Sequence, residues 1–184
     1  YGVLLTTCMG LGCSSQPNPS LRIFAASSLI EVFKSGEVAF EMRNPEIDVQ
    51  LQFAGSHILK SQIQSGAPAD VFASANRAHI QELFEADTVN SPVVFAANRM
   101  ALIVPNNNPK GVAELADLEG IERLILADQA APAGSYARQV LERAKNDLGA
   151  DWHGKVISRI VSNEPNVRLV TTKVGLGEAD AGLV

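Results

Sequence analysis

The sequence has few cysteines, few aromatic residues and no excess of positive charge. Its 184 residues include two cysteines and carry a formal net charge of −5. This charge argues against a nucleic-acid-binding surface, because such surfaces gather Lys and Arg. Aromatic residues form 5% of the chain, which argues against a site built from stacked rings. Both cysteines, Cys8 and Cys13, precede the globular part, so we expect no disulfide inside the fold.

The sequence also lacks the motifs of common catalytic and metal sites. Gly55-Ser56-His57 is not a nucleophile elbow, because Ile58 stands where the second Gly belongs. The three histidines have no metal-ligand spacing, and we interpret them as surface or capping residues: His57, His79 and His153. We therefore expect no enzyme activity, no cofactor and no directly coordinated metal.

The first twenty residues form an apolar stretch and a polar tether. Residues 2–13 (GVLLTTCMGLGC) are too short to span a membrane and resemble the later part of a secretion signal. Cys13 and the polar residues 14–20 are typical of a bacterial lipoprotein cleavage site, although Gly10 stands where Leu is usual. We expect residues 1–20 to be a signal or lipoprotein segment with Cys13 as the lipid anchor. A plain signal peptide with incidental cysteines is the alternative.

One pattern occurs four times in the remaining chain: a strand-like run, a few small or polar residues, and the start of a helix. The first occurrence, residues 21–33 (LRIFAASSLIEVF), has Ser27 and Ser28 at the junction. The other three junctions are Ala54-Gly55-Ser56, Pro132-Ala133-Gly134-Ser135 and Pro165-Asn166-Val167, with both prolines expected in the first turn of a helix.

Such junctions can bind anions. The first turn of a helix has backbone N–H groups without partners, and the helix dipole adds about half a positive charge there. If the four junctions converge, their partial charges sum to about two positive units without any Lys or Arg. For a single junction, simple capping of the helix by a serine side chain is the alternative.

Strands and helices alternate after residue 20, which predicts an α/β fold with mainly parallel sheets flanked by helices. We place a crossing between two lobes near Asn98, so that residues 21–97 form lobe 1 and residues 98–184 form lobe 2. The second lobe is expected to contain a helix at 112–116, strands at 124–127, 156–161 and 181–184, and helices at 135–148 and 166–174. A ligand would lie in the cleft that faces the carboxyl ends of the strands.

These stretches resemble, in order, the motifs of the periplasmic molybdate-binding proteins of ABC transporters. The resemblance covers nearly all of residues 21–184, and GAPADVFASA (66–75) is its most specific part. The other matching stretches are FAASSL (24–29), FAGSHIL (53–59), NRMALIVP (98–105), PAGSYA (132–137), NVR (166–168) and GEADAGLV (177–184).

The resemblance implies a two-lobed, type II periplasmic-binding-protein fold and a set of oxyanion ligands. Ser28 and Ser56 would each offer a hydroxyl and a backbone N–H, and Ala133 and Val167 a backbone N–H. Supporting positions would be Ser27, Gly55, Gly134 and Asn166. In the family a fifth ligand, a tyrosine hydroxyl, follows the GLV strand, as does a C-terminal return into the first lobe. Both would lie beyond Val184, so the chain looks like a fragment of such a protein.

The resemblance also implies a function. The protein would be a monomer that captures molybdate or tungstate and delivers it to the membrane permease of an ABC transporter. It would act in the periplasm or, through a lipidated Cys13, on the outer face of the cytoplasmic membrane.

The chemistry of a pocket that offers only donors agrees with this function. Such a pocket suits fully deprotonated dianions, whereas hydrogen phosphate needs an acceptor. Sulfate differs from molybdate in size, so the spacing of the donors must discriminate between them. The alternatives are a receptor for sulfate or thiosulfate and the effector-binding domain of a transcription regulator, which would carry an N-terminal helix-turn-helix.

Overall fold

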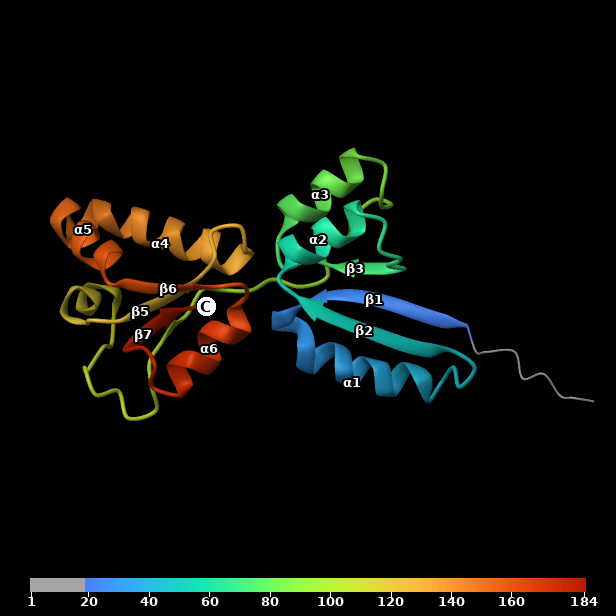
Figure 1. Ribbon diagram of the computed structural model, residues 1–184, viewed down its shortest axis with the longest axis horizontal. Coiled ribbons are helices and arrows are strands. Elements are labelled where there is room, and N and C mark those ends of the chain that lie inside the picture. The colour runs from blue at the N-terminus through green and yellow to red at the C-terminus, as the bar shows by residue number, and fades with distance from the viewer. Residues whose placement is uncertain (1–18) are drawn as a thin grey trace, which may run out of the picture.

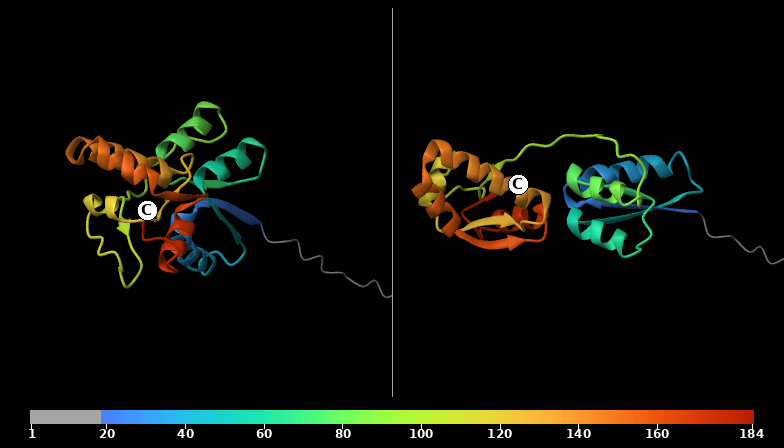
Figure 2. Two further views of the ribbon diagram at one scale, coloured as in Figure 1. Left: turned by 60° about the vertical axis from the view of Figure 1, so that its left-hand side comes forward. Right: turned by 90° about the horizontal axis from the view of Figure 1, so that it is seen from above.

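The computed structural model describes residues 19–184, which form two α/β lobes (Figure 1). The N-terminal lobe, residues 20–85, has a three-stranded sheet of order β2-β1-β3, and the C-terminal lobe, residues 102–183, has a four-stranded sheet of order β4-β7-β5-β6. Between them, residues 86–101 contain no helix or strand and cross from one lobe to the other (Figure 2). Asn98 lies in this segment, and the domain boundary placed there stays a prediction. The lipid-anchor candidate Cys13 lies outside the described residues.

In the N-terminal lobe the central strand β1 pairs in parallel with both of its neighbours. Leu59 and Ile63 of α2 and Leu83 of α3 pack with Phe24 of β1 in a small buried cluster. The elements are β1 (Ser20–Ala26), a 3-10 turn η1 (Ser27–Leu29), α1 (Ile30–Glu41), β2 (Asp48–Ala54), α2 (Ser56–Gln64), β3 (Val71–Ala73) and α3 (Arg77–Glu85).

In the C-terminal lobe β5 lies between β6 and β7 and is parallel to both, whereas β4 is antiparallel to β7. All four residues of β5 are buried, because helices cover both faces of the sheet. The elements are β4 (Leu102–Ile103), η2 (Leu115–Gly120), β5 (Leu124–Ala127), α4 (Pro132–Leu148), α5 (Ala150–Ser158), β6 (Ile160–Glu164), α6 (Val167–Gly175) and β7 (Ala181–Leu183).

The alternation of side chains along β5 explains the two cores of this lobe. Leu124 and Leu126 pack with residues of α4 and α5, including Trp152. Ile125 and Ala127 point to the other face and pack with α6 through residues such as Val170. The carboxyl ends of β5 and β6 are therefore held by well-packed helices.

The structure confirms the α/β class, the mainly parallel pairing and the four strand-to-helix junctions, and it corrects three details. Residues 156–158 end helix α5, so the strand predicted at 156–161 is wrong in its first half and begins at Ile160. The helix predicted at 112–116 is wrong, because a capping box between Glu114 and Asp117 starts the 3-10 helix η2 instead. Pro132 is the first residue of α4 as predicted, but Pro165 precedes the N-cap of α6 and lies outside the helix.

Candidate anion-binding site

The four strand-to-helix junctions meet at one cavity of about 340 Å³ that has walls from both lobes. All four predicted oxyanion ligands line it: Ser28, Ser56, Ala133 and Val167. Three of the supporting positions also line it, namely Ser27, Gly55 and Asn166. Gly134 does not line the cavity and is buried behind it in the first turn of α4. That these residues bind an anion stays a prediction.

In the N-terminal lobe two serines face the cavity in different states. Ser28 lies in η1, is exposed, and caps no helix with its side chain, so capping does not explain the Ser27-Ser28 pair. Ser56 is the first residue of α2 and only 1% exposed. Its hydroxyl oxygen accepts a hydrogen bond from the backbone N–H of Ala75 at 2.9 Å. Because that bond uses a lone pair, the hydroxyl hydrogen of Ser56 is free to be donated to a ligand.

In the C-terminal lobe the predicted donors are backbone amides. Ala133 lies in the first turn of α4, directly after Pro132, and Val167 is the first residue of α6. Amides at these positions have no partner within their helix. The side chain of Asn166 caps α6 by accepting from the N–H of Leu169 at 3.1 Å. Asn166 therefore satisfies an amide deeper in the turn and leaves that of Val167 to the cavity.

The cavity walls also contain three charged side chains that are not among the predicted site residues: Glu31, Arg99 and Arg168. The guanidinium of Arg168 on α6 forms an ion pair with the carboxylate of Glu31 on α1, so this pair joins the two lobes. The two arginines are donors, as expected of this pocket, whereas the carboxylate of Glu31 adds an acceptor that a pocket of donors alone would not have. Two signals were available in the sequence, because Arg168 belongs to the NVR stretch and Glu31 follows Ser28 by only three residues, so each lies beside a predicted junction.

A second contact between the lobes involves histidine. The His79 ring lies with its Nε2 3.2 Å from the carbonyl oxygen of Ala130, in the loop that leads into α4. Nδ1 of His79 and Nδ1 of His57 are buried without a hydrogen-bond partner. Burial lowers the pKa of His57, and the opposing effect of Asp128 does not fully offset it. Among residues 19–184, no three His, Cys, Asp or Glu side chains lie close enough to hold a metal ion.

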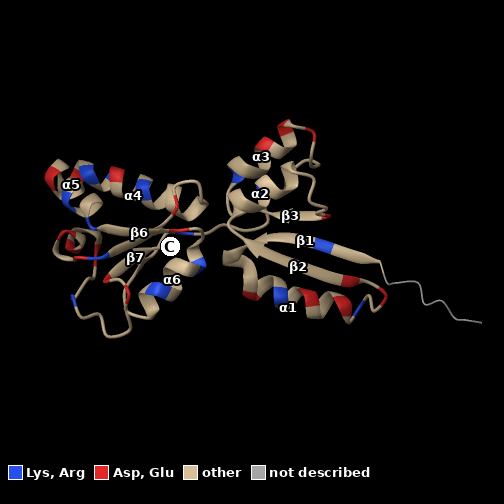
Figure 3. Ribbon diagram, viewed as in Figure 1, with Lys and Arg blue, Asp and Glu red and all other residues tan. Residues whose placement is uncertain are grey.

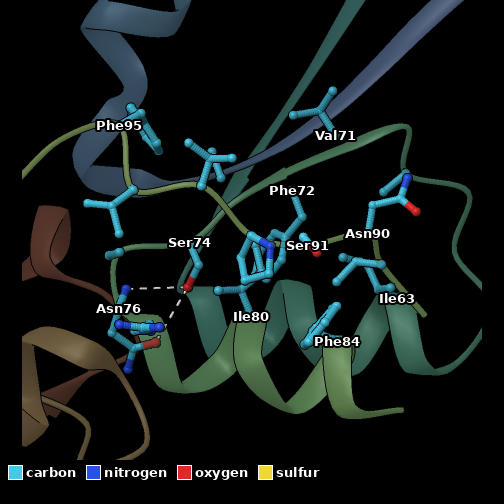
Figure 4. Close-up of a pocket in the computed structure, with 18 of the residues that line it drawn as sticks. Ile63, Val71, Phe72, Ser74, Asn76, Ile80, Phe84, Asn90, Ser91 and Phe95 are labelled. Carbon is cyan, nitrogen blue, oxygen red and sulfur yellow. Dashed lines mark hydrogen bonds between the residues drawn. The ribbon is translucent and has the colours of Figure 1, made fainter. Parts of the chain in front are cut away.

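A larger cavity of about 1010 Å³ is lined mainly by β3, α3 and the segment 87–96, and Tyr136 of α4 also belongs to its wall (Figure 4). Much of its wall is apolar, with aromatic side chains that include Phe72, Phe84 and Phe95. Two acidic residues, Asp70 and Asp87, and one basic residue, Arg77, also line it, so the charges of its wall do not favour an anion. This cavity contains none of the predicted donors, so we assign the candidate anion site to the smaller one.

Two properties of the described part of the chain bear on its partners. Acidic and basic residues occur together along α1 and α4 (Figure 3). In residues 19–184, the helices are too short or too polar to cross a lipid bilayer.

The chain is similar to proteins that bind molybdate. The molybdate-binding proteins ModA of Mycobacterium bovis and Mycobacterium tuberculosis are each 35% identical to it over 168 residues, which is 90% of this chain and 60% of theirs. The chain thus spans less than two thirds of the length of these relatives. ModA of Haemophilus influenzae is 31% identical over 183 residues, or 95% of this chain and 69% of that protein.

Solved structures show the same fold. The periplasmic molybdate-binding protein of Azotobacter vinelandii superposes with a TM-score of 0.68 at 22% identity, covering 89% of this chain and 70% of that one. The sulfate-binding protein SubI of Mycobacterium tuberculosis superposes with a TM-score of 0.71 at 18% identity, covering 90% and 64%. At these identities the likeness concerns the fold alone, which is the type II periplasmic-binding-protein fold implied by the motifs.

The family assignment comes from the sequence as a whole. Residues 21–184 match the family described as bacterial extracellular solute-binding protein. This match covers both lobes and every junction that lines the cavity. The chain belongs to the bacterial extracellular solute-binding proteins.

Proposed function

We propose that this protein captures molybdate or tungstate outside the cytoplasm and delivers it to the membrane permease of an ABC transporter. The observation that carries the proposal is the convergence of four strand-to-helix junctions, two from each lobe, on one cavity of about 340 Å³. The names of the relatives agree with it, because several are molybdate-binding proteins. The protein would act as a monomer, without catalysis and without a cofactor.

The donors suit a dianion that carries no proton. Serine hydroxyls and first-turn amides direct partial positive charge at the cavity, and Arg99 adds a full positive charge to its wall. Hydrogen phosphate would also need an acceptor for its proton. Glu31 is the carboxylate in the cavity wall, and its pairing with Arg168 reduces its capacity to accept from a ligand. The site therefore favours molybdate or tungstate over phosphate.

Binding would also close the cleft. An anion that touches Ser28 and Ser56 on one lobe and Ala133 and Val167 on the other makes all its contacts only when the lobes are together. Such a ligand stabilises the closed state by its difference in affinity for the two states. The lipid anchor at Cys13 would keep the protein near its permease, and this part of the proposal concerns residues outside the described structure.

Thermal unfolding with different anions tests the proposal. Molybdate and tungstate at micromolar concentration should raise the melting temperature, since a ligand at a hundred times its Kd stabilises by about 2.7 kcal/mol. Phosphate at the same concentration should have no effect. If neither molybdate nor tungstate shifts the transition, the proposed function is wrong. Equal shifts with phosphate would disprove the argument from the donor set.

The same experiment separates the alternatives. A receptor for sulfate or thiosulfate would be stabilised by those anions more than by molybdate. The effector domain of a transcription regulator is not favoured, because residues 21–184 match a family of extracellular solute-binding proteins.

A further inference from the structure

Arg138 joins the two junctions of the C-terminal lobe. It lies on α4 one turn after Gly134, and its Nη1 donates hydrogen bonds to the carbonyl oxygens of Ala127 and Gly134, each at 2.9 Å. Its Nη2 donates to the side-chain oxygen of Asn163. One planar guanidinium therefore contacts the end of β5, the first turn of α4 and the end of β6, and its rigid fork fixes their relative positions.

Backbone contacts limit how closely the first turn of α4 can approach the end of β5. A Cβ placed on Gly134 would lie 2.0 Å from the carbonyl oxygen of Asp128 and 2.3 Å from that of Ala127. The first turn of α4 thus already lies as close to the end of β5 as a glycine allows. Backbone contact sets the minimum distance between the two segments, and the hydrogen bonds of Arg138 hold them near it.

The two segments that Arg138 joins carry the predicted amide donors. Ala133 directly precedes Gly134, and Val167 follows Asn163 by four residues. A hydroxyl can rotate to meet a ligand, whereas a backbone amide moves only with its chain. The spacing between these two amides is therefore fixed by whatever fixes their segments.

We propose that Arg138 is a positioning residue that sets the spacing between the amides of Ala133 and Val167, and thereby the size of tetrahedral anion that the site accepts. This inference rests on the proposed function. Molybdate and sulfate share charge and shape and differ in size, so donor spacing is the property that separates them. Arg138 does not line the cavity, so it acts through the two amides rather than on the anion.

The first test is the substitution Arg138→Lys, which keeps the charge and loses the fork. Molybdate affinity should fall on the order of tenfold, which is the lower end of the loss found when residues that orient metal-binding side chains are removed. Sulfate affinity should fall less, so the preference for molybdate over sulfate decreases. Isothermal titration with molybdate, and competition between molybdate and sulfate, measure both quantities. The matched control is Arg143→Lys on the exposed side of the same helix, which should change neither.

The second test needs no anion. In nitrogen-15 NMR spectra of the free protein, Arg138→Lys should shift the amide resonances of Ala133 and Val167 and speed their hydrogen exchange. Asn163→Ala removes only the contact to β6, so it should change Val167 and leave Ala133 as it is. A melting temperature within the range of the Arg143→Lys control shows that each variant is folded.

The outcomes separate this inference from the proposed function. If Arg138→Lys lowers the affinity for both anions equally, or leaves the two amides unchanged, Arg138 does not set the spacing and the inference is overturned. If the unaltered protein binds no molybdate, the proposed function fails, while the NMR comparison still reports whether Arg138 positions the amides.

Discussion

In the N-terminal lobe the predicted ligands include two serine hydroxyls, whereas in the C-terminal lobe they are backbone amides of Ala133 and Val167. The two lobes also differ in how completely their sheets are buried. Three of the seven residues of β1, the central strand of the N-terminal sheet, are buried, whereas all four residues of β5 in the C-terminal sheet are buried. Hydroxyls can adjust by rotating about one bond, but amides depend on the backbone that carries them. The lobe that offers only amides is thus the one with the more completely packed sheet.

The largest effect should come from adding a methyl group at the tightest point of the C-terminal lobe. Gly134→Ala would place a Cβ 2.0 Å from a backbone oxygen, so we expect a loss of about 3 kcal/mol in the free energy of unfolding. The control is Gly36→Ala in α1, where nothing beyond the neighbouring residues and backbone of the helix itself lies within 4 Å of the new Cβ. That variant should gain up to about 1 kcal/mol from helix propensity. Urea unfolding measures both changes. If Gly134→Ala and Gly36→Ala have equal free energies of unfolding, the proposed difference in packing between the lobes is wrong.

Substitution of the two serines should distinguish an effect on molybdate affinity from an effect on the free energy of unfolding. Ser28→Ala and Ser56→Ala should each weaken molybdate binding by about 1–3 kcal/mol, the range for hydrogen bonds to charged groups. Only Ser56→Ala should also lower the free energy of unfolding, by roughly 1 kcal/mol, because the Ala75 amide loses its acceptor. Titration calorimetry and urea unfolding give the two quantities.

A control serine lies in the C-terminal lobe. Ser135 is in the first turn of α4 and does not line the cavity, so Ser135→Ala should leave molybdate affinity unchanged. Unchanged affinity in Ser28→Ala and Ser56→Ala as well would remove the hydroxyls from the site and leave the amides as the only ligands.

The smallest effect should come from the ion pair that joins the lobes. Glu31 and Arg168 are 67% and 42% exposed, and exposed pairs contribute about 0.2–1 kcal/mol. We expect Glu31→Gln and Arg168→Gln to speed molybdate release modestly at low salt and to lose this effect at high salt. The exchanged pair, Glu31→Arg with Arg168→Glu, should restore slow release in stopped-flow measurements.

A pair within one lobe provides the comparison for this prediction. Lys155 and Glu119 form an exposed ion pair inside the C-terminal lobe, so Lys155→Gln should not alter molybdate release. If Lys155→Gln has the same effect as Arg168→Gln, the pair between Glu31 and Arg168 has no special role in holding the lobes together.

The sequence predicted the elements best where local signals agreed. The helix expected at 166–174 is α6, which spans Val167–Gly175 with Asn166 as its N-cap. The prediction failed where an apolar run fits either type of element. Residues 156–161 were expected as a strand, but Trp152 and Val156 are spaced four apart and both face the core, so the helix continues to Ser158.

Local sequence determined the chemistry of the four junctions, because the start of a helix depends on a few neighbouring residues and on the small side chains before it. Only the tertiary structure decided that the junctions share one cavity and that Glu31 meets Arg168, 137 residues away. It also decided that Arg138 contacts both amide-bearing segments. These contacts depend on how the two sheets and their helices pack, and the periodicity of a single segment carries no information about a partner so distant in the chain.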